Sequence, residues 1–154
     1  MLRLISTLRT WLAASSSRKS RTFPATREAL QDATAYLDRL LESGGCPPAV
    51  QSALDIVLDE IASNIVAYSG ATGFTLEVAF VPDGVRLVFS DDGTPYDPLT
   101  HEDPDTTLSA EARAIGGLGI LMVKKMTDSA TYRRARNRNV LTLFKRFPPK
   151  AVEG

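Results

Sequence analysis

The first half of the chain contains two stretches in which apolar residues recur every three or four positions, the spacing of an amphipathic helix. The first stretch follows Thr26, a residue type that commonly caps a helix N-terminus, and it ends at the segment SGGCPP, 43–48. The second stretch runs from about Pro48 to Tyr68 and keeps the same spacing. The pattern therefore predicts two consecutive helices, preceded by a short extended piece at 21–24.

The second half of the chain changes to the alternation of apolar and polar residues that is typical of half-buried strands. Two hairpins are predicted, one with strands at 73–81 and 85–91 around PDG, and one with strands at 130–135 and 139–147 around RNRN. Between them we expect a third helix that opens at GGLG, 116–119, and ends near Asp128. Because strands do not alternate with helices, the order favours an α/β (α+β) two-layer sandwich, with a mixed, mostly antiparallel sheet and helices on one face.

The same pattern divides the chain into a leader at 1–20, one domain at 21–148 and a tail at 149–154. The leader fits a short amphipathic anchor or partner-binding helix, or a frayed terminus, and we favour the frayed terminus. Arg3 and Arg9 interrupt its apolar positions, and no run approaches the roughly 18 apolar residues of a membrane span. We therefore expect no membrane span.

Composition excludes several classes of function. The 154 residues carry 18 Lys and Arg and 18 Asp and Glu, so the formal net charge is zero and gives no general attraction to nucleic acid. The single cysteine, Cys46, cannot form a disulfide within the chain, and nothing suggests a zinc cluster. These features fit a cytoplasmic domain that makes no direct contact with nucleic acid.

Two polar residues lie at the edge of the apolar face of the second predicted helix. At about 100° per residue, Glu60 and Asn64 fall on one flank of the apolar stripe, whereas Asp59 points to solvent. A carboxylate and an amide oxygen on successive turns can hold a hard divalent cation and orient a nucleophile. Taken alone, the pair is more commonly the ordinary polar flank of an amphipathic helix.

Two further polar signals follow the first hairpin and open the third helix. SDDGTPYDP, 90–98, places a carboxylate and a glycine at a strand end, where they can bind an exocyclic amine and a flat ring. GGLGI, 116–120, opens a helix whose first N–H groups can approach a phosphate. Singly, the first is also an ordinary Asp-Gly turn and the second a flexible connection. In this order, the three signals describe a nucleotide pocket covered by a movable loop at about 99–115.

These motifs resemble those of the GHKL ATPase/kinase superfamily, most closely the small bacterial anti-sigma-factor serine/threonine kinases of the RsbW/SpoIIAB type. LDEIASNIVAYSG is similar to their N box, FSDDGTPYDP to their first glycine box and GGLGILMVKKMTDSATY to their second. The likeness extends from about Arg21 to Phe147 and implies the Bergerat, or GHKL, ATP-binding fold. The only histidine, His101, lies in the expected lid, which argues against the histidine-kinase members of the superfamily.

The resemblance implies a role for each residue of the first two motifs. Asn64 would coordinate a Mg²⁺ ion that bridges the ATP phosphates. Glu60 would act as the general base for γ-phosphoryl transfer, or orient the substrate hydroxyl. Asp91 would accept a hydrogen bond from the adenine amino group, and Gly93 would allow the close approach of the ring.

For the second glycine box, the resemblance implies that Gly117, Leu118 and Gly119 form the turn at the triphosphate, with Gly116 as a hinge of the lid. The chain departs from the pattern at the last hairpin, where the superfamily often has a Gly-Thr pair. RNRNVLTLF contains no glycine, so no ligand is assigned there.

The function implied by the resemblance is that of an ATP-dependent serine/threonine kinase and anti-sigma factor that phosphorylates a STAS-domain antagonist. With nucleotide bound, such a protein holds a sigma factor away from RNA polymerase, and members of the type usually form homodimers. Two alternatives stay open on the residues. One is an ATP-gated regulator that transfers no phosphate, and the other is a switch kinase that binds no sigma factor.

Overall fold

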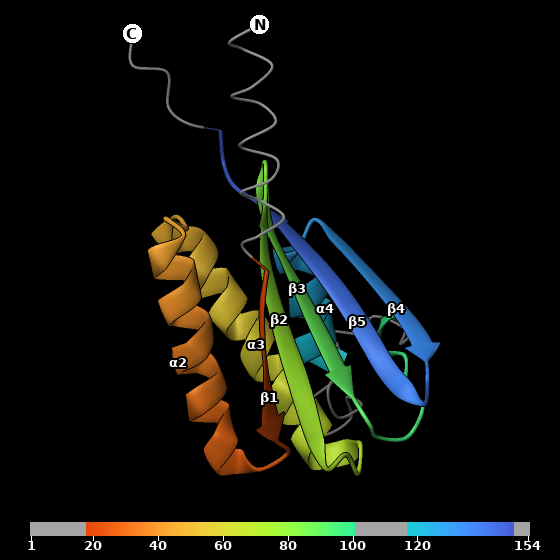
Figure 1. Cartoon of the computed structure of the whole chain (residues 1–154). Helices are drawn as coiled ribbons and strands as arrows, with labels where there is room; N and C mark the ends of the chain where they lie inside the picture. Colours follow the sequence, from red (N-terminus) through yellow and green to blue (C-terminus); the bar gives the residue numbers. More distant parts are fainter. Residues whose placement is uncertain (1–17, 101–116, 150–154) are drawn as a thin grey trace, which may run out of the picture.

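One five-stranded sheet organises the protein, in the order β1-β2-β3-β5-β4 (Figure 1). The structure is a computed structural model, and it describes residues 18–100 and 117–149. The strands are β1 (Lys19–Pro24), β2 (Gly73–Val81), β3 (Gly84–Asp91), β4 (Ser129–Ala135) and β5 (Arg138–Arg146). Every neighbouring pair of described strands is antiparallel. Both predicted hairpins are therefore confirmed.

Helices cover one face of this sheet and form the second layer. They are α2 (Arg27–Ser43), α3 (Pro48–Tyr68) and α4 (Gly117–Met126), with a short 3-10 helix, η1, at Pro98–Thr100. Helix α3 lies between α2 and α4 and contacts both, and Figure 1 shows α2 and α3 side by side along the sheet. The predicted two-layer sandwich is confirmed.

Local signals in the sequence explain where these elements begin and end. The Thr26 side chain accepts a hydrogen bond from the Ala29 N–H at 3.3 Å, and so caps α2 as expected. A proline opens α3, where its missing N–H leaves no helical hydrogen bond unmade. The turn between β4 and β5 holds Arg136 and Asn137 at positive φ, the backbone form that suits a two-residue hairpin.

Two element limits differ from the sequence-based expectation. Strand β1 begins at Lys19, two residues before the expected start of the domain. Helix α4 ends at Met126, two residues before the position around which its end was expected, because the Asp128 N–H donates to the Phe144 carbonyl of β5 at 2.8 Å. That bond to the sheet takes the place of another helical turn. The segment expected to form the lid, apart from its start in η1, lies outside the described residues.

The core lies between the inner face of the sheet and the helices. Side chains alternate along β2 and β3, so that the inward positions are buried and the outward positions are partly exposed. Phe23 of β1 packs against Phe74 and Tyr36, with ring centroids 5.5 and 5.8 Å apart. Within the described residues, no helix is both long enough and apolar enough to cross a membrane.

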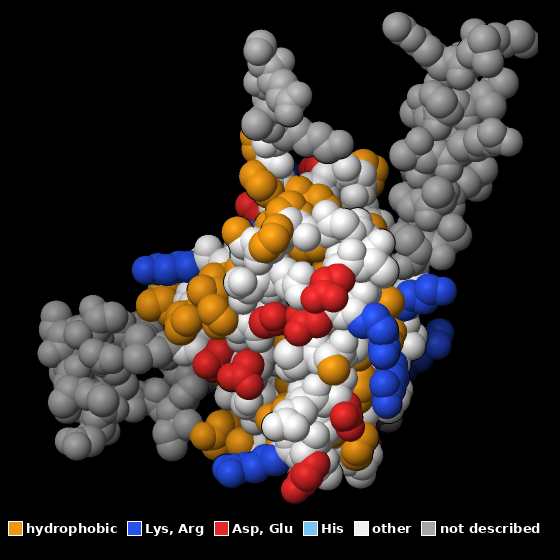
Figure 2. All heavy atoms as spheres, turned by 90° about the vertical axis from the view of Figure 1, so that its left-hand side faces the viewer, with side chains coloured by type: hydrophobic (Ala, Val, Ile, Leu, Met, Phe, Trp, Pro, Cys, Tyr) orange, Lys and Arg blue, Asp and Glu red, His pale blue; other side chains and the backbone are white. Residues whose placement is uncertain are grey.

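Acidic side chains meet where α2 packs against α3. The view onto the side of these helices shows several Asp and Glu side chains near its centre (Figure 2). The Gln51 side-chain amide donates to Asp38 at 3.1 Å and to Glu42 at 3.2 Å. Burial, the hydrogen bond and charge of Asp38, and then the charge of Glu42 raise the pKa of Asp55 to about 7. The folded protein therefore keeps a proton at this junction until the pH approaches about 7.

This proton makes the stability of the fold depend on pH in an unusual direction for an aspartate. Because the pKa of Asp55 is raised on folding, its contribution is full below the unfolded pKa of about 3.9 and is lost as pH rises toward 7. Asp55→Asn should remove this loss, because an amide can donate to Asp38 at any pH. We expect the midpoint of thermal unfolding (Tm) of the variant to gain about 2–4 °C on wild type between pH 5 and 8, as about 1 kcal/mol would produce.

The control is Asp59→Asn, one turn further along α3 at an exposed position. Its Tm should follow that of wild type across the same pH range. A constant difference between Asp55→Asn and wild type from pH 5 to 8 would contradict the assignment of the proton to this junction.

Candidate functional site

The inward face of the sheet ends in two polar side chains. Along β3, Leu87, Phe89 and Asp91 occupy successive inward positions, and Asp91 stands opposite Asn139 of β5 in the register. Both are only 6% exposed, although every other buried position on the inner face is apolar or a glycine. Strand alternation thus directs a carboxylate and an amide toward the helical layer at one end of the sheet.

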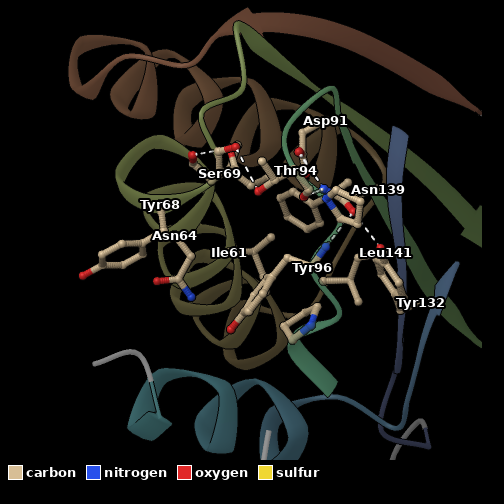
Figure 3. Close-up of a pocket in the computed structure, with 14 residues that line it drawn as sticks. Ile61, Asn64, Tyr68, Ser69, Asp91, Thr94, Tyr96, Tyr132, Asn139 and Leu141 are labelled. Atoms are coloured by element: carbon tan, nitrogen blue, oxygen red, sulfur yellow. Dashed lines mark hydrogen bonds between the residues drawn. The ribbon is translucent and has the colours of Figure 1, made fainter. Parts of the chain in front are cut away.

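The Asp91 carboxylate is held from one side only. Its Oδ1 accepts a hydrogen bond from the Gly93 N–H at 2.9 Å. It also accepts one from the Asn139 side-chain amide at 3.0 Å (Figure 3). Its Oδ2 accepts no hydrogen bond from the described residues. A carboxylate oxygen is an acceptor with no hydrogen of its own when ionised, so Oδ2 is suited to a ligand N–H.

A cavity of about 430 Å³ opens beside Asp91, within the range of small-molecule sites. Its walls come from α3, the end of β3, the loop after β3, and the β4–β5 hairpin. The residues that line it are Ile61, Asn64, Ile65, Tyr68, Ser69, Phe89, Asp91, Thr94, Pro95, Tyr96, Pro98, Tyr132, Asn139 and Leu141. Most of these are aliphatic or aromatic, so the cavity suits a flat, largely apolar ring with one polar edge at Asp91.

Asn64 lies on the α3 wall of the same cavity. It is half-buried and stands between Ile61 and Ile65, which are part of the core. No residue within 18–100 and 117–149 forms a hydrogen bond with the side-chain amide of Asn64. Asn64 and Asp91 come from separate motifs, and the structure brings both to one cavity (Figure 3).

Glu60 lies one turn before Asn64 but does not line the cavity. It is half-buried, whereas Asp59 is exposed, as the helical pattern predicted for both. The Glu60 carboxylate reaches α4, where it occupies the space that a side chain at Gly119 would take. A glycine at 119 therefore allows the N-box carboxylate to lie against the first turn of α4.

The other residues of the second glycine box are placed only in part. Gly117, Leu118 and Gly119 form the first turn of α4, so the glycine box opens a helix as expected. Gly119 does not line the described cavity. Gly116 lies outside the described residues. The predicted roles of these residues at a triphosphate therefore stay predictions.

Gly93 has a role in packing that the sequence did not suggest. A Cβ at this position would lie 2.6 Å from the Ser69 Cβ, 2.7 Å from the Ser69 carbonyl oxygen and 2.8 Å from Asp91 Oδ1. The next residue, Thr94, donates its N–H to the same Ser69 carbonyl at 3.0 Å. Gly93 thus lets the loop after β3 close onto the end of α3, and it does not itself line the cavity.

Asp92 faces the opposite direction from its neighbour Asp91. It accepts hydrogen bonds from the Thr72 hydroxyl and N–H and from the Gly73 N–H, and these bonds hold the pKa of Asp92 below its usual value. Asp92 therefore anchors the connection between α3 and β2.

Three residues of the site were missed in the sequence, namely Asn139, Tyr132 and Tyr96. The search for a Gly-Thr pair assigned nothing to the last hairpin, yet Asn139 bonds directly to Asp91. A usable signal existed, because Asn139, Leu141 and Leu143 share one face of a strand. A polar residue in an otherwise apolar inward row is a candidate site residue.

The described residues contain no group of three or more His, Cys, Asp or Glu side chains that could hold a metal ion by themselves. On the α3 wall of the cavity, the side-chain amide oxygen of Asn64 is the candidate metal ligand. Mg²⁺ commonly takes few protein ligands and completes its shell with substrate phosphates and water. The residues present fit a cation that arrives with a phosphate ligand.

Residues 23–145 match the sequence profile of the family described as the histidine kinase-like ATPase domain. The matched region covers most of the chain and includes all three motifs. No curated protein matches the chain.

Solved structures share the fold. The RsbU and RsbW domains of Rv1364c from Mycobacterium tuberculosis match with a TM-score of 0.63 and 20% identity over 86% of this chain. This chain covers 33% of that protein, so it spans about one third of its length. The SiaB-SiaC complex from Pseudomonas aeruginosa matches with a TM-score of 0.58 and 15% identity over 94% of this chain and 99% of that one. Identities this low show a common fold.

The contacts of the two glycines predict different effects of adding one methyl group. Gly93→Ala should destabilise the protein by about 1–3 kcal/mol, because the new Cβ would meet the Ser69 backbone, which cannot move freely. Gly119→Ala should change stability by less than about 1 kcal/mol, since alanine favours the helix and only the flexible end of Glu60 must move. Urea unfolding of both variants measures the difference. Equal losses in the two variants would contradict these placements.

Proposed function

The chain belongs to the histidine kinase-like ATPase domain family, and on that premise we propose that it is a Mg²⁺- and ATP-dependent protein serine/threonine kinase. The observation that carries this proposal is the meeting of Asp91 and Asn64 at one apolar cavity. Family membership implies that ATP binds. We propose that the adenine lies in this cavity, and that the metal-bound phosphates lie beside Asn64.

The cavity offers what an adenine ring requires. Phe89, Ile65 and Leu141 supply apolar surface for the faces of the ring, and Asp91 Oδ2 supplies an acceptor for its exocyclic amine. Guanine carries a carbonyl oxygen at the equivalent position, and a carboxylate oxygen would repel it. We therefore propose that the cavity prefers adenine to guanine.

The phosphates would extend from the cavity along α3 toward α4. Asn64 on the cavity wall would hold the Mg²⁺ that neutralises the phosphate charge when ATP is bound. The first turn of α4, with Gly117 and Gly119, presents backbone N–H groups and the positive end of a helix dipole. Glu60 lies against this turn, next to the place where the terminal phosphate would arrive.

The proposed reaction transfers the γ-phosphoryl group to a serine or threonine hydroxyl of a protein substrate. The hydroxyl oxygen forms a bond to the γ-phosphorus, the bond to the β-phosphate oxygen breaks and ADP leaves. Glu60 orients the hydroxyl and receives its proton. The chain thus contributes position and charge, and no covalent intermediate with the protein is needed.

We propose a STAS-domain antagonist as the substrate and a sigma factor as a second partner of a homodimeric kinase. Support comes from the three ordered motifs, which resemble the anti-sigma-factor kinases, and from the fold shared with the RsbW domain of Rv1364c and with the SiaB-SiaC complex. Glu60 does not line the cavity but lies against the first turn of α4, where the terminal phosphate is proposed to arrive, and this position favours the kinase. One alternative is a regulator that binds ATP without transferring phosphate. A switch kinase that binds no sigma factor is the other alternative.

Nucleotide binding is tested by calorimetry with ATP and Mg²⁺. Asp91→Asn should weaken ATP binding by about 10- to 100-fold, since it replaces a charged acceptor of the adenine amine by a neutral amide. Asn64→Ala should leave binding without Mg²⁺ unchanged and remove the gain in affinity that Mg²⁺ gives. Asp92→Asn is the matched control, because that carboxylate contacts Thr72 and should not affect affinity. Absence of ATP binding by wild type would overturn the proposed function.

Phosphoryl transfer is tested with the STAS-domain proteins encoded in the same genome as substrates. Glu60→Gln should keep ATP binding and lower the transfer rate by about 10²- to 10⁴-fold, the usual contribution of a general base. Gly119→Ala should also slow transfer, because its methyl group displaces the Glu60 carboxylate. The exposed Asp59→Asn should transfer at the wild-type rate. ATP-dependent partner binding without transfer by wild type would favour the regulator that only binds.

A further inference from the structure

Asn139 is buried and fully hydrogen-bonded on the wall of the cavity. Its Nδ2 donates to Asp91 Oδ1 at 3.0 Å and to the Thr94 carbonyl at 2.8 Å. Its Oδ1 accepts from the Tyr96 N–H at 3.1 Å and from the Tyr132 hydroxyl at 2.6 Å. One amide therefore connects β3, the loop after it and the β4–β5 hairpin (Figure 3).

The partners of Asn139 fix the direction of its amide. A carboxylate and a carbonyl can only accept, so they must face the NH₂ group, and the Tyr96 N–H can only donate, so it must face the oxygen. A flipped amide would place its oxygen against Asp91 and the Thr94 carbonyl. Asn139 is thus held in one orientation, and the Tyr132 hydroxyl must donate to it.

This saturation defines what Asn139 can do. Both of its hydrogens and its oxygen are used within the protein, so the amide has no hydrogen left to donate to a ligand. Its effect on a ligand must therefore pass through Asp91. With Oδ1 of Asp91 occupied by Asn139 and Gly93, the carboxylate plane is set and only Oδ2 is offered to the cavity.

We propose that Asn139 is a positioning residue that sets the base selectivity of this cavity, by holding Asp91 so that it accepts from a ligand bearing an exocyclic amine. This inference rests on the proposed function, because it takes the cavity as the site of the base. The Tyr132 hydroxyl holds Asn139 in place through its hydrogen bond. The β4–β5 hairpin, which carries both residues, is bound to the loop after β3 by Arg134, whose side chain donates to the Gly93 carbonyl at 2.8 Å.

The proposal predicts that losing Asn139 changes selectivity and not only affinity. The test compares the dissociation constant of ATP with that of purine riboside triphosphate, which lacks the 6-amino group. Wild type should prefer ATP by about 10- to 100-fold, the range for a hydrogen bond to a charged group. In Asn139→Ala this preference should fall below about threefold. In the Asp91→Ala background, adding Asn139→Ala should cause no further loss of preference.

Asn139→Asp supplies a second variant of the same shape, in case the alanine variant unfolds. At pH 8 it places a carboxylate against Asp91 and should lose the preference for ATP. At pH 6 a shared proton can restore one donor, so the preference should partly return. Tyr132→Phe should reduce the preference by an intermediate amount. The control is Asn137→Gly, which removes an exposed amide at a positive φ on the same hairpin.

The outcomes separate the two proposals. If wild type binds ATP and Asn139→Ala keeps the full preference over the analogue, the positioning role is wrong while nucleotide binding stands. If Asn139→Ala weakens both nucleotides equally and Asn139→Asp shows no return at pH 6, Asn139 serves only the fold and the inference is overturned. If wild type binds neither nucleotide, the proposed function is wrong and the inference falls with it.

Discussion

The hydrogen bond between Asp91 and Asn139 is the contact on which the cavity depends. A carboxylate can end an apolar row inside a protein only where donors compensate for its lost hydration. Here the Gly93 N–H and the Asn139 amide provide them. Asn139 is also hydrogen-bonded to the loop after β3, at the Thr94 carbonyl and the Tyr96 N–H. Removing this contact would leave the Gly93 N–H as the one donor to Asp91 among the described residues, and it would also loosen the wall of the cavity.

Helix α3 joins this cavity to the rest of the candidate site. Its buried face carries Ile61 and Ile65 into the core, and Asn64 follows on the flank that faces the cavity. One turn earlier, Glu60 reaches the first turn of α4 through the space left by Gly119. A single rigid helix thus sets the separation between Asn64, which is proposed to hold the metal, and Glu60, which is proposed to act at the transferred phosphate. Rigid placement of this kind is what phosphoryl transfer requires, since the protein contributes mainly position and charge.

Much of the fold could be predicted because its signals are local. Proline at the start of α3, Thr26 as a cap and the strict alternation of β3 each depend on neighbouring residues, and each was confirmed. The end of α4 was placed two residues too late because a bond from Asp128 to β5 decides it. No local pattern contains that bond. The same reason explains Asn139, whose importance arises only when β5 pairs with β3 and brings it opposite Asp91.

The sequence by itself determined the order of the elements, the two-layer arrangement and the identity of Glu60, Asn64 and Asp91 as candidates. It could do so because hydrophobic periodicity and short motifs act over a few residues. Tertiary structure alone decided that Asn64 and Asp91 share a cavity, that Glu60 meets Gly119, and that Asn139 fixes the carboxylate. Each of these contacts joins residues more than 20 positions apart, so it depends on strand register and helix packing, which no single segment encodes.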